Sequence, residues 1–332
     1  MPGPTVEPFL PQHASTSDLA RWCEIFREGQ SELSGSSPRP FALAERLLAA
    51  DTPAVSRWAA RGGAGAPLDG VAELLPQPRD PRLGFLRLFV APPARRLGLG
   101  SALLERVTHE ARTIGVDRVQ GTVLAGPPGE PFAATCPDLR VLLRLERQEQ
   151  RLDREAVLRR CRALAVCPDS RYKLTHWRGA APARLIASFG RVMGHVLDAP
   201  GADLQLAPRA WDAAAVRDWE ARMTAGGQRL KVCAAVYLPS GDVVAATVTT
   251  VPTDGGAVAD QHDTAVLPEH RRRGLARWVK AEQTLSLHRL FPGVRAVVGT
   301  LNQRNLPMLA VNRTVGYRRV RERLLVETMP RP

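Results

Sequence analysis

The stretch LPEHRRRGLA, residues 267–276, has a counterpart in VAPPARRLGLG, residues 90–100. Arg95 corresponds to Arg271 and Gly98 to Gly274, and both pairs are 176 residues apart. Each copy follows a pattern typical of a strand and precedes one typical of an amphipathic helix. A basic surface patch needs no such register, whereas a loop of defined shape does. The repeat therefore predicts two copies of one strand–loop–helix unit.

The repeated loop has the pattern R-x-x-G-x-[G/A]. A helix that opens on glycine leaves its first backbone N–H groups without partners, and these form an anion site with the positive end of the helix dipole. Glycine also allows an anion to approach the backbone closely. The neighbouring arginines are expected to add charge without setting the geometry. Neither loop continues as a Walker P-loop, and neither has the three glycines of a dinucleotide fingerprint. The loops predict a phosphate or pyrophosphate site in each half.

The surrounding pattern predicts a strand over 83–90, a helix that ends near Gly115 and a strand over 117–124 in the first half. In the second half we expect a hairpin at PSGD, a strand that ends at Pro268, a helix over about 275–290 and a further strand from 294. With 332 residues the chain is long enough for two domains. We expect them at 1–150 and 166–332, joined by a charged, solvated helical linker at 151–165.

Composition narrows the class of protein. The net charge of +13 comes almost entirely from arginine, and no nucleic-acid-binding motif accompanies it. The five cysteines include no C-x-x-C pair and none lies beside a histidine at ligand spacing, so we expect reduced thiols and no metal site. No apolar run is long enough for a membrane span, and the N-terminus does not resemble a secretory signal. These features predict a cytoplasmic protein, monomeric or homodimeric, with nucleic acid and membrane disfavoured as partners.

After a strand, V-x-P-x-x-R-x-x-G-x-[G/A] resembles motif A of the GNAT superfamily, the GCN5-related N-acetyltransferases. Two copies in register resemble a tandem GNAT protein, a layout shared with actinobacterial mycothiol synthase and with tandem GNAT proteins of antibiotic clusters. The resemblance implies an α/β (α+β) fold of two GNAT domains. Each would have a mixed, mainly antiparallel sheet with splayed fourth and fifth strands, flanked by helices. It also implies acetyl-CoA or another acyl-CoA as cofactor, up to one per domain, and a small-molecule amine as acceptor.

The resemblance assigns the pyrophosphate to the loop and the pantetheine arm to the edge of strand four. In the second half these positions are Ala265, Val266, Leu267, Arg271, Arg272, Arg273, Gly274, Leu275 and Ala276. In the first half they are Phe89, Val90, Arg95, Arg96, Leu97, Gly98, Leu99, Gly100 and Ser101.

TLNQRNLPMLAVNRTVGY, residues 300–317, resembles the closing motif of the family, with Gly316 and Tyr317 at the expected spacing. Asn302 and Asn305 are then placed to reach the amides of the cofactor. For Asn305 the alternative is N-capping of the following helix, and the two roles are compatible.

Transfer to an amine needs a polarised carbonyl, a base and a protonated leaving thiolate. Asp260, His262 and Asp263 give the fourth strand of the second half three candidates for the base. Strand alternation, in the absence of a bulge, puts Asp260 and His262 on one face; the alternative is a polar cluster that holds the strands apart. The usual acid of the family is a tyrosine, and Asn312 stands at that position. A thiol leaves without much help, so activity does not require that tyrosine.

The first half offers no such chemistry. Gly84 corresponds to Asp260, and Arg87 is the ionisable side chain of that apolar strand. We therefore expect a first domain that binds CoA or is structural, and a second domain that transfers an acyl group from acyl-CoA to an amine. Two alternatives stay open: a non-catalytic CoA-binding regulatory protein, and an aminoacyl-tRNA-dependent transferase of GNAT-like fold. Nothing in the residues names the acceptor; antibiotic biosynthesis is a guess from the arginine-rich composition.

Overall fold

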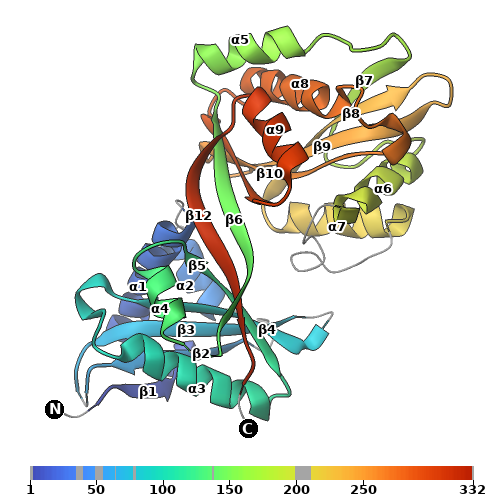
Figure 1. Ribbon diagram of the computed structural model, residues 1–332. Helices are drawn as coiled ribbons and strands as arrows, with labels where there is room; N and C mark the ends of the chain where they lie inside the picture. Colours follow the sequence, from blue (N-terminus) through green and yellow to red (C-terminus); the bar gives the residue numbers. More distant parts are fainter. Residues whose placement is uncertain are drawn as a thin grey trace. The chain divides into compact units, whose positions relative to one another are not determined.

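The structure is a computed structural model that describes residues 3–34, 40–48, 55–63, 65–77, 80–136, 138–198 and 211–330. Its contacts divide the chain into two units. Unit 1 consists of Met1–Arg144 and Arg323–Pro332, and unit 2 of Leu145–Glu322. Each unit is a mixed β-sheet with helices packed on it (Figure 1). The predicted α/β class is thus confirmed.

The sheet of unit 1 has the strand order β1, β2, β3, β4, β5 and the end of β12. Only the β4–β5 pair is parallel among these pairings. The strands are β1 (Thr5–Pro8), β2 (Ser56–Arg61), β3 (Leu68–Gln77), β4 (Asp80–Val90), β5 (Arg118–Leu124) and β12 (Arg318–Thr328). The helices are α1 (Thr16–Ser34), α2 (Pro40–Leu48), α3 (Leu99–Thr113) and α4 (Gly129–Ala134), with short 3-10 turns η1 (Pro11–His13) and η2 (Pro92–Ala94).

Unit 1 has a core on each face of its sheet. On one face Trp22 and Phe26 of α1 pack against Val71 of β3. On the other, a row of α3 side chains packs against Trp58 and Leu74. That row is Leu99, Leu103, Val107 and Ala111, whose spacing of three or four residues makes one helical stripe.

Unit 2 repeats the plan. Its sheet has the order β6, β11, β10, β9, β8, β7, and β10–β11 is the parallel pair. The strands are β6 (Arg140–Arg151), β7 (Tyr172–Arg178), β8 (Gln228–Tyr237), β9 (Asp242–Pro252), β10 (Val258–Val266) and β11 (Ala296–Asn302). The helices are α5 (Glu155–Leu164), α6 (Ile186–Gly194), α7 (Ala213–Ala225), α8 (Leu275–Leu290) and α9 (Leu306–Thr314), with 3-10 turns η3 (His195–Asp198) and η4 (Pro268–His270).

The parallel pair separates in both units. β4 pairs with β5 from Leu83 to Leu86, although β4 continues to Val90. β10 pairs with β11 from Val258 to Asp260 and continues to Val266. Beyond those registers the strands part, as the splayed pair of the predicted fold requires. The gap that opens is where each pocket lies.

The linker expected over 151–165 is observed in part: α5 is a helix, as expected, but it is not fully solvated, since Leu158 and Cys161 are buried. Residues 145–151, just before it, form the part of β6 that pairs with β11 in unit 2. Glu146, Gln148 and Gln150 alternate along the strand and are buried. A row of buried residues with polar side chains has the period of a strand but no hydrophobic signal, so composition suggested a solvated helix.

The unit boundaries also differ from the expected 1–150 and 166–332. Residues 323–328 of β12 pair with β5 and belong to unit 1, and Leu324, Leu325 and Val326 are buried there. The physical reason is that β5 needs a second partner to satisfy its backbone groups. Unit 1 therefore obtains one of its strands from the end of the chain. The sequence pattern does not predict this pairing, because an apolar strand pattern does not indicate which strand it pairs with.

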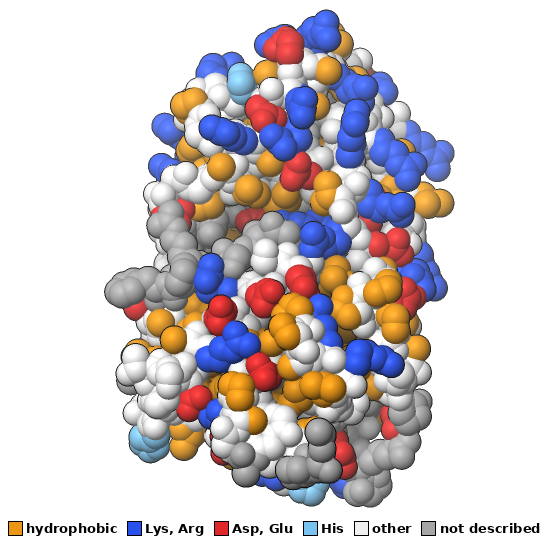
Figure 2. All heavy atoms as spheres, turned by 90° about the vertical axis from the view of Figure 1, so that its left-hand side faces the viewer, with side chains coloured by type: hydrophobic (Ala, Val, Ile, Leu, Met, Phe, Trp, Pro, Cys, Tyr) orange, Lys and Arg blue, Asp and Glu red, His pale blue; other side chains and the backbone are white. Residues whose placement is uncertain are grey.

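Charge is dispersed on the surface. On the face shown in Figure 2, Lys and Arg side chains are interspersed with acidic and apolar ones. Several arginines are held in ion pairs, including Arg61 with Asp18 and Arg118 with Asp80. In the described ranges, each helix is too short or too polar to cross a bilayer.

Candidate functional site

The two predicted loops have the same backbone. In each, a 3-10 turn that begins at proline leads to an arginine and then a glycine in the left-handed region. Arg96 has φ 69° and Gly98 φ 84°; Arg272 has φ 61° and Gly274 φ 79°. Gly98 and Gly274 are the N-caps of α3 and α8. Left-handed residues just before a helix turn successive backbone N–H groups towards one point, the arrangement that binds anions.

The first arginine of each loop does more than add charge, which corrects the sequence-based expectation. The Nε of Arg271 donates to the carbonyl oxygen of Val266 at 3.0 Å, and Nη2 lies 2.5 Å from Asp198. The Nε of Arg95 likewise donates to Val90 at 3.1 Å, and its Nη2 lies 2.6 Å from Glu32. Each side chain thus ties the loop back to the end of the preceding strand.

Asp198 gains a second partner in His195, whose Nδ1 lies 2.8 Å away. The hydrogen bond from Arg271, followed by the one from His195, holds the pKa of the Asp198 carboxyl below its usual value. The carboxylate is therefore charged at neutral pH, and Arg271 is committed to the loop. Since this guanidinium is already bonded to Val266 and Asp198, the backbone amides are the candidate anion donors of the loop.

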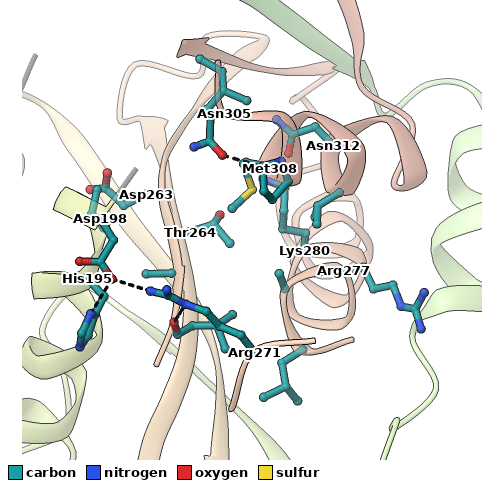
Figure 3. A pocket seen from close by; sticks show the side chains of 18 of the residues that line it. His195, Asp198, Asp263, Thr264, Arg271, Arg277, Lys280, Asn305, Met308 and Asn312 are labelled. Carbon is teal, nitrogen blue, oxygen red and sulfur yellow. Dashed lines mark hydrogen bonds and ion pairs between the residues drawn. The ribbon is translucent and has the colours of Figure 1, made fainter. Parts of the chain in front are cut away.

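In unit 2 the loop opens into a cavity of about 940 Å³ (Figure 3). Most of the predicted site residues of this half line it: His262, Asp263, Ala265, Val266, Arg271, Arg272, Gly274, Leu275, Ala276, Asn302, Asn305 and Asn312. Asp260, Leu267 and Arg273 do not. Leu267 is buried in the core beside the strand, and Arg273 is exposed.

β10 is bulged where it lines the cavity. Its register with β9 passes from Gln261 opposite Thr249 to Thr264 opposite Thr247, so two residues face Val248 alone. The side chain of Gln261 donates to the Val248 carbonyl at 2.8 Å. A bulge of this kind takes a backbone N–H out of the regular ladder and redirects the strand. The bulge leaves Asp260 and His262 on one face, since His262 bonds to Thr250, the residue opposite Asp260, and it moves Thr264 to the face of Gln261.

The three candidate bases have different surroundings. His262 is exposed at the cavity, and its Nε2 lies 2.9 Å from Oγ1 of Thr250. Asp260 also keeps an exposed side chain, yet the protein packed around it raises the pKa of its carboxyl, against opposing effects of His262 and Arg147. Asp263 is half-buried at the cavity wall.

The asparagines at the end of β11 have structural partners. Asn305 caps α9, since its Oδ1 accepts from the backbone N–H of Met308 at 3.2 Å. Its Nδ2 stays available as a donor at the cavity. Asn302 is buried, and its Oδ1 accepts from the N–H of Arg304 at 3.0 Å. Capping of Asn305, one of the two predicted roles, is therefore observed.

Asn312 belongs to a buried hydrogen-bond chain. Its Nδ2 donates to Oε1 of Gln148 at 2.6 Å, and the Nε2 of Gln148 donates to Glu146. Because a carboxylate only accepts, Glu146 sets the orientation of Gln148, and Gln148 sets that of Asn312. The Oδ1 of Asn312 is left without a partner among the described residues. An amide does not ionise near neutral pH, so at this position of the cavity wall the protein has no acid.

Comparison with known proteins agrees with this geometry. The sequence profile of the acetyltransferase (GNAT) family matches residues 19–128. A tandem GNAT protein from the clavulanic acid biosynthesis pathway superposes with a TM-score of 0.73 at 21% identity, covering 99% of both chains. A GCN5-related N-acetyltransferase from Sphaerobacter thermophilus has a TM-score of 0.66 at 16% identity, covering 99% of this chain and 96% of that one. No curated protein matches the sequence.

The chain thus has the fold of a tandem GNAT protein. The pockets of its two units are unlike. That of unit 1 has a volume of about 440 Å³ and is lined by Phe89, Val90, Arg95, Arg96, Gly98, Gly100 and Ser101 of the predicted residues, without Leu97 and Leu99. Its further lining is mainly apolar, with Leu86, Leu88 and Phe132 among it. Glu32 also reaches this pocket but is paired with Arg95.

The sequence analysis did not identify one residue that lines the cavity of unit 2. Lys280, on the face of α8 that also carries Ala276 and Arg277, lines the cavity and is only 2% exposed. Burial lowers the pKa of its ammonium to about 7. Its Nζ lies 4.9 Å from the centre of the Tyr317 ring. The available signal was its register, since Lys280 corresponds to Leu104 in the first half.

Proposed function

We propose that this chain is an acyl-CoA-dependent N-acyltransferase in which unit 2 transfers an acyl group, most simply acetyl, to the amine of a small molecule. One observation carries the proposal: the left-handed loop of unit 2 opens on a cavity that also holds a bulged polar strand. The GNAT family match and the tandem GNAT fold support the acyl-CoA class.

The residues present fit an acyl-CoA. The backbone amides from Arg272 to Ala276 would hold its pyrophosphate, because the left-handed loop turns them to one point. The edge of β10 at Ala265 and Val266 would pair with the amides of the pantetheine arm, and Nδ2 of Asn305 would donate to it. When bound, the thioester supplies an acyl group on a good leaving group.

The proton of the attacking amine would go to His262, which faces the cavity, or to Asp260 through water. The raised pKa of Asp260 makes it a better base than an ordinary carboxylate. Asp263, the next residue of β10 and also at the cavity, would support the charge that forms on His262. An N–H of the β10 bulge is the candidate donor to the thioester oxygen.

Unit 1 would bind a second acyl-CoA at Arg95–Ser101 or act structurally. The loop there has the same backbone, but its pocket offers no base except a carboxylate already in an ion pair. The acceptor is proposed as a small molecule of specialised metabolism; the similar tandem GNAT protein belongs to clavulanic acid biosynthesis. We propose a cytoplasmic location, where acyl-CoA is made.

Native mass spectrometry of the purified chain tests cofactor binding by counting CoA molecules per chain. Release of thiol from acetyl-CoA with a panel of amines tests transfer. Bound CoA with no turnover across the panel would favour a regulatory CoA-binding protein. Salt-sensitive binding of aminoacyl-tRNA without CoA binding would favour the tRNA-dependent alternative.

A further inference from the structure

Lys280 is a buried cation at the cavity with little to neutralise it. Across the described residues, its Nζ makes no hydrogen bond or ion pair, and its contact is the face of the Tyr317 ring. The ring is itself fixed, since its hydroxyl donates to Oε1 of Gln261 at 3.3 Å. Burial of an ammonium group costs the free energy of its hydration. A lysine that is buried at a cavity despite this cost therefore indicates a function for its charge.

Its place in the cavity suggests which function. Lys280 lies six residues after Gly274, roughly 9 Å further along the axis of α8 at about 1.5 Å per residue. It is therefore well past the pyrophosphate site, towards the end of the cavity where β10 and β11 are still paired. Figure 3 draws it with Asn312 and Met308 of α9, across the cavity from Thr264 of β10.

Asn312, which also lines the cavity, cannot protonate a leaving thiolate. Asn312 donates an N–H of its amide to Gln148, and its Oδ1 is buried without a hydrogen-bond partner among the described residues. An amide oxygen repels a thiolate and gives it no proton. In unit 1 the position of Lys280 is taken by Leu104, and that unit also lacks the polar strand. The lysine thus occurs in the same half as the candidate bases.

We propose that Lys280 is the proton donor to the departing thiolate of CoA in unit 2. This inference rests on the proposed function. As the amine adduct collapses, the C–S bond breaks and its electron pair moves to sulfur. A proton on Nζ of Lys280 then passes to sulfur, which leaves a neutral lysine amine that solvent reprotonates.

The surroundings favour such a donor. The pKa of Lys280 at about 7 lies below that of an ordinary thiol, about 8.5, so the proton transfer runs downhill. The elements packed on α8 carry several titratable groups, none bonded to Lys280 in the described structure. They include Cys161 on α5, Lys231 and Cys233 on β8, Asp260, His262 and Asp263 on β10, and Tyr317 after α9.

The test is the pKa of the CoA thiol when bound, followed through the ultraviolet absorbance of the thiolate, with desulfo-CoA as blank. The wild-type protein should lower that pKa by about one unit or more, because the thiol and Lys280 titrate as a coupled pair and formation of the thiolate holds a proton on the amine beside it. Lys280→Leu, which installs the residue of unit 1, should abolish the shift. Lys280→Met is a second variant with an unbranched chain, and Lys173→Met controls for the loss of an exposed charge.

An equal shift in the wild-type protein and both Lys280 variants would overturn the proposal, as would no shift in any. Failure of the wild-type protein to bind either CoA or desulfo-CoA would instead overturn the proposed function. Once an acceptor is known, Lys280→Leu should lower kcat at unchanged CoA affinity, and acyl thioesters of more acidic thiols should restore most of it. A loss that such thioesters do not restore would contradict proton donation.

Discussion

The two loops share a backbone, yet the pockets behind them differ. In both, a left-handed arginine and glycine precede a helix, and an arginine ties the loop to its strand. Behind the loop of unit 2 stand His262, Asp263 and Lys280, whereas unit 1 has Leu86 and Leu104. The comparison teaches that a phosphate cradle is set by main-chain geometry, while reactivity depends on side chains that the cradle does not constrain.

The largest expected effect concerns the buried lysine. The pKa of Lys280 is about 7 in the folded protein and about 10.4 in an unfolded chain. Between these values the unfolded state binds the extra proton, so the stability of the wild-type protein should rise from pH 7 to 10. The gain should be roughly 4 kcal/mol, at 1.36 kcal/mol per pKa unit. Lys280→Leu should lack it, and denaturant unfolding of both proteins across that range measures the difference. If the stability of the two proteins changed with pH in parallel, folding would not lower the pKa of Lys280.

Leu324→Ala tests whether the stability of unit 1 depends on the strand at the end of the chain. Leu324 is 0% exposed and lies on the strand that pairs with β5. The substitution should cost about 2–5 kcal/mol, because it removes buried methyl groups and leaves a cavity. Hydrogen exchange should rise at residues 118–124 of unit 1. Val297→Ala, in β11, is the matched control and should raise exchange in unit 2. Faster exchange at β11 in the Leu324 variant would contradict the assignment of this strand.

Gly274→Ala and Gly98→Ala separate the two loops. An alanine at a φ near 80° is strained by about 1–2 kcal/mol, and at Gly274 its Cβ would lie 3.2 Å from the Arg277 guanidinium. Gly274→Ala should weaken CoA binding to unit 2 about tenfold or more and reduce transfer in parallel. Gly98→Ala should affect only binding to unit 1. Calorimetric titration of each variant checks both expectations, and equal losses of transfer would break the distinction between the units.

Arg271→Gln should have the smallest effect. It removes the hydrogen bond to Val266 and the ion pair with Asp198, but leaves the backbone amides of the loop. CoA affinity should fall severalfold, since an exposed pair is worth about 1 kcal/mol or less. Arg95→Gln is the counterpart in unit 1. A loss of a hundredfold or more in Arg271→Gln would mean that the guanidinium itself binds the ligand.

The sequence by itself determined the repeat, the α/β class and the loops, because these depend on local geometry. A short stretch of sequence is enough to recognise a glycine at a positive φ, a proline at the start of a turn or an apolar helix stripe. No short stretch of sequence reveals the amide chain to Asn312, the bulge in β10 or the burial of Lys280.

Only the tertiary structure decided those three features, since each depends on residues far apart in the chain. Asn312 is oriented by Gln148, 164 positions away. The strand that completes unit 1 comes from residues 323–328, because hydrogen-bonding groups at a sheet edge accept any extended segment that the chain can deliver. The local sequence pattern predicts the helices and strands. The pairing of strands across the sheet decides which of these elements belong to the same unit and which side chains face the pocket of that unit.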